Sequence, residues 1–90
     1  MDVREAITAH ARKMHRHLEE FVRLDEEREL AIDEAVSLCR AGKPFSVDEI
    51  NRVTALINEH AKHGKSPTRP YVDPSMVEAY VSRLNNNESH

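Results

Sequence analysis

The feature that most constrains this chain is its N-terminal stretch, which contains neither glycine nor proline from Met1 to Ala41. Apolar residues recur in it at intervals of three and four, with histidines and Arg28 in some of the gaps. This spacing is typical of one face of a helix. The apolar positions are Val3, Ile7, Met14, Phe21, Leu24, Ala31, Ala35 and Leu38. We therefore predict one long helix over about residues 3–41.

The length of this helix decides the architecture. A continuous helix over residues 3–41 would be about 58 Å long at 1.5 Å per residue. A compact chain of 90 residues has a radius of gyration of only about 12 Å. A bend or break at residues 25–29, where Asp25 could cap a new helix, would shorten the molecule. Strong helix formers and the absence of turn residues there favour the continuous helix, which would overhang a monomer.

A second helix is predicted over about residues 47–63, antiparallel to the first. Ser46 and Glu49 have the spacing of a capping box, and Gly64 follows the last helical residue as a C′ glycine would. The apolar stripe of this helix comprises Ile50, Val53, Leu56, Ile57, His60 and Ala61. Folded back from a turn at residues 42–45, this helix would place His60 opposite about residue 27.

The remaining residues predict an extended segment followed by a short helix. Residues 65–73 contain two prolines and no helical period, so they should run extended across the surface. Asp73 and Pro74 suit the N-cap and first position of a helix over about residues 74–84. We expect residues 85–90 to be a disordered tail. The fold class is all-α, with a single helical domain over residues 1–84.

Composition narrows the possible functions. The net charge of −3 gives no general attraction to nucleic acid or to an anionic membrane. No apolar run approaches the roughly 20 residues needed to span a bilayer. The single cysteine, Cys39, cannot form an internal disulfide. We expect a cytoplasmic protein without a membrane span or a cofactor. No recognisable arrangement of catalytic residues is present, so we expect that the protein is not an enzyme.

His10 and His17 are the first candidates for chemistry. They are seven residues apart, which separates them by about 10.5 Å along a helix axis. Two ligands of one zinc ion must each lie about 2 Å from the metal, so these two cannot share an ion in a straight helix. We interpret them as interface histidines. Facing their symmetry mates across a dimer, they would become charged near pH 6 and weaken it.

Glu59, His60 and His63 are the candidates for a metal site. His60 and His63 are three residues apart and Glu59 is four residues from His63, so ligands could lie on one helical face. The alternative is structural. His60 falls in the apolar stripe, and His63 lies in the last turn, where a cation favours the helix dipole.

Arg12, Lys13 and Arg16 form the densest basic group and leave nucleic-acid binding as a weaker alternative. Residues 19–34, however, hold eight acidic residues against two arginines. Arg16 can pair with Glu20 at i, i+4, as a solvated helix face would allow. We therefore do not expect a nucleic-acid partner.

The part of the first helix that the second cannot reach predicts self-association, with a dimer favoured. The residues expected at that interface are Val3, Ile7, His10, Met14, His17, Leu18 and Phe21. We accordingly expect a non-enzymatic, self-associating helical interaction or regulatory protein. The alternatives are a metal-binding or pH-responsive protein that uses its histidines and, more weakly, a nucleic-acid-binding protein.

The run AVSLCRAGKPFSVDEINRVTALINEHAKHG, followed by PTRPYV, resembles a small family of uncharacterised proteins from Bacillus and its relatives. The resemblance covers nearly the whole chain, and GKPFS followed by DEIN is its most distinctive part. It implies a cytoplasmic bacterial protein of unknown function. The family brings no assigned activity, ligand or catalytic residue that could be carried over to positions of this sequence.

Overall fold

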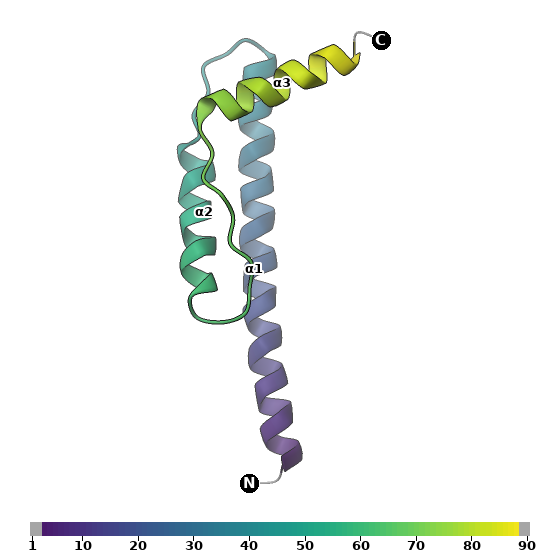
Figure 1. Cartoon of the computed structure of the whole chain (residues 1–90), viewed down its shortest axis with the longest axis vertical. Helices are drawn as coiled ribbons and strands as arrows, with labels where there is room; N and C mark the ends of the chain where they lie inside the picture. Colours follow the sequence, from purple (N-terminus) through teal and green to yellow (C-terminus); the bar gives the residue numbers. More distant parts are fainter. Residues whose placement is uncertain (1–2, 89–90) are drawn as a thin grey trace.

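The molecule is built from three helices, of which the first two lie along its long axis (Figure 1). The computed structural model describes the backbone of residues 3–88 and the side chains of residues 11–86. The helices are α1 (Val3–Arg40), α2 (Asp48–Ala61) and α3 (Pro74–Glu88). Figure 1 shows α2 folded back along α1, and α3 crossing the C-terminal end of α1. The radius of gyration of 18.1 Å and the extents of 62 × 28 × 15 Å describe a rod. The predicted all-α fold is confirmed.

The first helix is continuous for 38 residues, so the predicted long helix is confirmed. It runs without a break through residues 25–29. The guanidinium of Arg23 bridges the carboxylates of Glu20 and Glu27, which lie three residues before it and four after it. Ion pairs of this spacing stabilise a helix. The acidic run therefore supports the helix instead of ending it.

Gly42 ends α1. It has a φ of +70°, which side chains with a Cβ rarely adopt. Its N–H donates to the carbonyl of Cys39 at 3.1 Å, and the N–H of Lys43 donates to that of Leu38 at 2.9 Å. This pair of bonds defines a Schellman motif.

The connector at residues 43–47 is not a tight turn, and this changes the register of α2. Phe45 is half-buried and Val47 is buried, both against the cluster that contains Ala35. The connector thus travels back along α1 before α2 begins. As a result His60 packs against His17 and not opposite residue 27, and the expected register was wrong.

Both predicted ends of α2 differ in detail from expectation. Ser46 does not form a capping box: its Oγ accepts a bond from the N–H of Asp48 at 3.1 Å. The carboxylate of Glu49 instead binds the guanidinium of Arg52 at 2.6 and 3.0 Å. Gly64 does not have the positive φ of a C′ glycine.

The core consists of two clusters on the side of α1 that faces α2. The first joins all three helices and the connector through Ala35, Val47, Ile50, Val77 and Val81. The second joins α1 and α2 through Phe21, Leu24, Val53 and Ile57. Burial of each large aliphatic side chain stabilises the fold by about 1.5–3 kcal/mol. Toward the N-terminus of α1, the described core stops at Phe21.

The start of α3 is as predicted, but its end is not. The Asp73 carboxylate accepts bonds from the N–H of Met76 at 3.0 Å and the hydroxyl of Ser75 at 2.5 Å. These bonds hold the pKa of Asp73 below its ordinary value. The helix then continues to Glu88, beyond the end predicted at about residue 84. Residues 89 and 90 lie outside the described residues.

Candidate functional site

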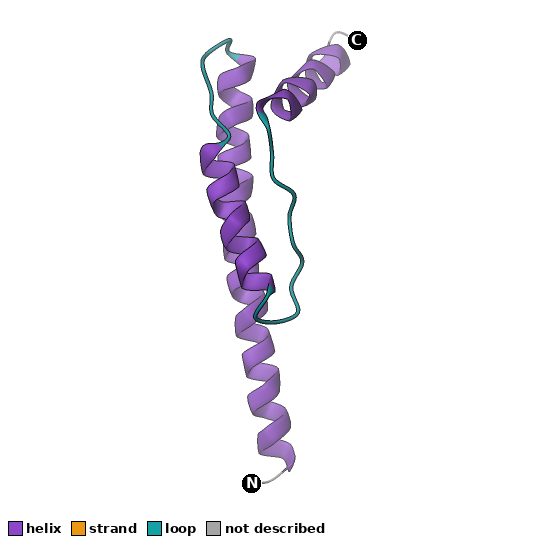
Figure 2. Cartoon of the chain, turned by 60° about the vertical axis from the view of Figure 1, so that its left-hand side comes forward, coloured by secondary structure: helices purple, strands orange, loops and turns teal. Residues whose placement is uncertain are grey.

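The extended residues 65–73, here named the strap, are tied to α2 by two asparagines. Figure 2 shows the strap running back alongside α1 and α2. The Asn58 amide accepts a bond from the N–H of Arg69 at 2.8 Å and donates to its carbonyl at 3.0 Å. The Asn51 amide makes the same two bonds with Val72, both at 2.8 Å. Two side chains thus satisfy backbone groups that have no sheet or helix partner.

A buried arginine crosses from α1 to the strap. Arg28 is only 8% exposed. Its Nε donates to the Oγ1 of Thr54 at 2.9 Å, and its terminal nitrogen donates to the carbonyl of Pro70 at 3.0 Å. The Thr54 hydroxyl donates in turn to the carbonyl of Ile50 at 2.8 Å. Because each of these groups has a partner, the arginine can be buried without the large cost of an unsatisfied polar group.

Arg69 fastens the strap to α1. Its guanidinium binds both carboxylate oxygens of Asp25, at 3.0 and 3.2 Å. It also lies over the ring of Phe21, with its central carbon 5.1 Å from the ring centroid, which is a cation–π geometry. The strap is therefore bound to both α1 and α2. Its Arg69 covers Phe21 of the second core cluster.

Two histidines meet where α2 ends. The rings of His17 and His60 stack with their centroids 3.8 Å apart and their planes 15° from parallel. The Nε2 of His60 donates to the backbone carbonyl of His17 at 2.8 Å. The Nε2 of His17 lies 3.0 Å from the Oγ of Ser66. A Cβ added to Gly64 would lie 2.7 Å from the His17 ring, so this glycine permits the close contact.

The stack favours a neutral His17. Its partial burial, and then the charges of His60 and His63, lower the pKa of His17 below its ordinary value. Two protonated rings at this distance would repel. We expected His17 to face its symmetry mate across a dimer, but the structure pairs it with His60 of the same chain.

The metal-site candidates are not gathered around one point. His60 is turned toward α1, while the Glu59 carboxylate lies 3.0 Å from the Nζ of Lys62 and 3.7 Å from the Nε2 of His63. These cations hold the pKa of Glu59 below its ordinary value, Lys62 most strongly. Within the described residues, no three His, Cys, Asp or Glu side chains are placed to hold a metal ion.

The interface candidates divide into covered and uncovered residues. Met14 and Leu18 are each 41% exposed, and Val22, one turn further on, is 51% exposed. Phe21 is buried by its own chain and His17 is half-buried by His60. Neither side chain is therefore exposed to a second subunit in the way that we expected. The side chains of Val3, Ile7 and His10 lie outside the described residues. Of the basic group, Arg12, Lys13 and Arg16 are exposed.

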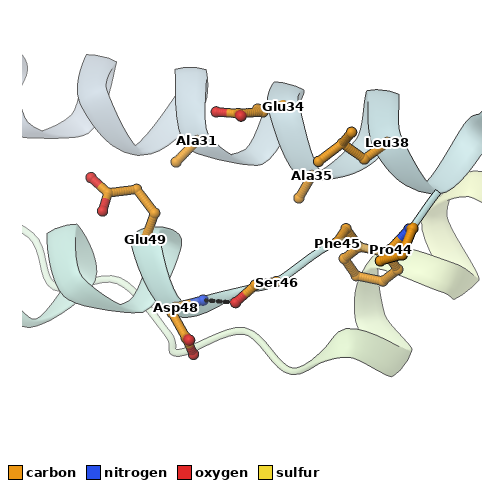
Figure 3. A pocket seen from close by; sticks show the side chains of 9 residues that line it. All are labelled: Ala31, Glu34, Ala35, Leu38, Pro44, Phe45, Ser46, Asp48 and Glu49. Carbon is orange, nitrogen blue, oxygen red and sulfur yellow. Dashed lines mark hydrogen bonds between the residues drawn. The ribbon is translucent and has the colours of Figure 1, made fainter.

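A hollow lies at the other end of α2, between α1 and the connector, and is about 550 Å³ in volume. Figure 3 shows Ala31, Ala35 and Leu38 of α1 on one side of it, with Phe45 and Pro44 of the connector facing them. Asp48 and Glu49 at its edge belong to the first turn of α2. Acidic residues at that position stabilise the helix dipole, which gives them a structural role.

The sequence reasoning missed the residues that fix the strap: Asp25, Arg28, Asn51, Asn58 and Arg69. A signal was present for three of them. Asn51 and Asn58 are seven residues apart, and this spacing places them on one face of α2, two turns apart. Arg28 falls at a position of the apolar stripe of α1, and a charged residue at such a position indicates a buried polar contact.

A long helix, an antiparallel partner helix and a strap bound by side-chain amides define a small all-α protein. The chain belongs to the family described as "Protein of unknown function (DUF2533)", whose model matches residues 1–83. It is 48% identical over 83 residues to "Uncharacterized protein YpbS" of Bacillus subtilis (strain 168), covering 92% of this chain and 98% of that protein. The resemblance seen in the sequence is thus confirmed.

These comparisons leave the function of the family unknown, and neither description indicates an enzymatic activity. No solved structure gave a significant match. None of the helices in the described part of the chain is both long and apolar enough to cross a membrane.

Proposed function

We propose that this chain is a non-enzymatic helical interaction or regulatory protein of the cytoplasm that works as a homodimer. The observation that carries the proposal is an uncovered apolar stripe on α1, named here the open stripe. It comprises Ala11, Met14, Leu18 and Val22, which are all exposed. They recur at intervals of three and four, so they form one continuous helix face. A continuous apolar face on an exposed helix is typical of a protein–protein contact.

Charge favours a second copy, in antiparallel orientation, as the occupant of the open stripe. The α1 helix is basic at residues 12–16 and acidic at residues 19–34. If Leu18 of one copy lies against Val22 of the other, residues 12–16 of one copy lie level along the axis with the partner's residues 24–28, which contain three acidic residues and one arginine. A parallel pair in register would instead place the basic residues 12–16 of the two copies side by side, where they repel. Electrostatic complementarity of this kind selects the partner and its orientation.

The test is a matched pair of substitutions, read by native mass spectrometry of protein purified without an affinity tag. Leu18→Glu places a charge in the open stripe. Leu56→Glu is the control, because Leu56 is 43% exposed on α2 and Leu18 is 41% exposed. We expect the wild type and the control to be dimers and Leu18→Glu to be a monomer. Dissociation of both variants, or of neither, would contradict the proposal.

A second candidate, a pH-responsive protein, is favoured by the His17–His60 stack. Its sensor would act within one chain, by loosening the end of α2 from α1 on protonation. The same mass spectra report any retained metal ion, which would favour the metal-binding alternative instead.

A further inference from the structure

A pocket lies below the end of α2 on the side of α1 that faces that helix, and we name it the basal pocket. It is lined by Lys13, Met14, His17, His63, Gly64 and Lys65 and has a volume of about 380 Å³. That volume falls within the roughly 300–1,000 Å³ usual for small-molecule sites. Three of the lining residues belong to α1, and the other three follow α2.

Every ionisable residue that lines the basal pocket is basic. Two lysines and two histidines face it, and no carboxylate lines it. Lys13 and Lys65 form no ion pair with any of the described residues, whereas Lys62, Arg23 and Arg52 are each paired with a glutamate. Two lysines that line one pocket repel each other through their charges, and an anion bound between them would offset that repulsion.

The wall of the pocket is already fixed in position. The His17 ring is held by the His60 ring on one side, by Gly64 close to it, and by the Ser66 hydroxyl at its edge. The last carbonyls of α2 are capped, since those of Glu59 and His60 accept bonds from the N–H groups of Lys62 and His63. A fixed wall lowers the ordering cost of binding a ligand.

We propose that the basal pocket binds a small phosphoryl-bearing anion. Lys13 and Lys65 provide two charges from different parts of the chain, and the His17 ring closes the pocket. Lysine binds phosphate groups as a point charge, and two lysines match a dianion. Met14 and Gly64 leave an apolar wall beside this anion site.

The basal pocket and the open stripe share only Met14. At 3.6 residues per turn, Lys13 and His17 lie roughly 100–140° around α1 from Leu18. Met14 stands at the border between the pocket and the open stripe. A lysine substitution therefore tests the pocket without a change at Leu18 or Val22.

Calorimetric titration with inorganic pyrophosphate at low salt, using the full chain, tests the proposal. The wild type should bind one anion per chain, and Lys13→Gln/Lys65→Gln should bind at least about tenfold more weakly. The control Lys43→Gln/Arg83→Gln removes the same total charge from exposed residues away from the pocket and should bind within about twofold of wild type. Absence of saturable binding to the wild type, or equal weakening in both double variants, would overturn the proposal.

A second measurement locates the anion and identifies its chemistry. The imidazole NMR signals of His17 and His63 should shift on titration, and those of exposed His15 should not. Tighter binding of ATP than of pyrophosphate, lost in the lysine variant, would support the pocket and indicate a nucleotide. Equal affinities would support it and indicate free phosphate compounds. Binding of citrate as tight as that of pyrophosphate would overturn the assignment to phosphoryl groups.

Discussion

The two sections of α1 have similar sequence patterns and different surroundings. One side of residues 17–40 is covered by α2, the strap and α3, whereas residues 3–16 extend beyond the end of α2 (Figure 1). Both sections carry apolar residues at helical spacing. The difference comes from the elements that follow α1 in the chain: within the described residues, α2 packs on α1 only as far as His17, and beyond it residues 63–65 come near α1, at the basal pocket. Periodicity thus identifies the face of a helix that will be covered, but not whether the same chain covers it.

The largest difference in stability should come from replacing one arginine in each section of α1. Arg28→Ala removes a buried side chain and leaves the Pro70 carbonyl without its donor. We expect a loss of about 2–4 kcal/mol in the free energy of unfolding. Arg16→Ala, in the exposed section, should change it by less than about 0.5 kcal/mol. Urea denaturation measures both, and equal losses would contradict the division of α1 into two sections.

The strap should depend on its amide bonds. Asn58→Ala leaves the backbone N–H and carbonyl of Arg69 without partners, so we expect a loss of about 1–3 kcal/mol. Asn58→Asp keeps the acceptor for the N–H and should lose less. Limited proteolysis within residues 65–73 should accelerate in the same order. If Asn58→Ala is as stable and as resistant as wild type, the strap is not held in the way we describe.

The two glycines separate backbone strain from side-chain contact. Gly64→Ala places a methyl group against the His17 ring and should cost about 1–2 kcal/mol. Gly42→Ala strains a residue with φ of +70° and should cost about 1 kcal/mol, with open space around its Cβ. Only Gly64→Ala should displace the NMR signals of the His17 ring. Undisturbed His17 signals in that variant would show that the ring does not lie against Gly64.

The smallest effect should be the pH dependence of stability. The pKa of His17 is lowered in the folded protein, so the unfolded state binds more protons as the pH falls. The free energy of unfolding should therefore decrease as the pH drops through about 6.5, the unfolded value, toward the folded pKa. His17→Gln should flatten this decrease, and His15→Gln should not. The urea midpoint at pH about 7.5 and about 5.5 gives the comparison.

Much of the fold followed from local signals in the sequence. Helix propensity predicts the long α1, and the two prolines within residues 65–73 predict the extended strap. Capping chemistry predicts the helix start at Asp73–Pro74. All of these effects act within a few residues. The register of α2 did not follow in this way. The register of α2 depends on the packing of Phe45 and Val47 against α1. The sequence of the connector does not reveal this tertiary contact.

The candidate site was only partly predictable for the same reason. His60 was recognised as part of a buried stripe, but its partner His17 could not be found without the register. The spacing of Asn51 and Asn58 places them on one face of α2, but it does not indicate that they bind backbone atoms of residues up to 21 positions further along the chain. Buried polar contacts between segments are set by the tertiary fold, after the elements have formed.

The central claim is that a second copy covers the open stripe of α1. Light scattering of the wild-type chain at tens of micromolar tests it directly. The chain has a mass of 10.3 kDa, so we predict a species of twice that mass. A mass of 10.3 kDa throughout this concentration range would contradict the account and leave the open stripe without its proposed partner.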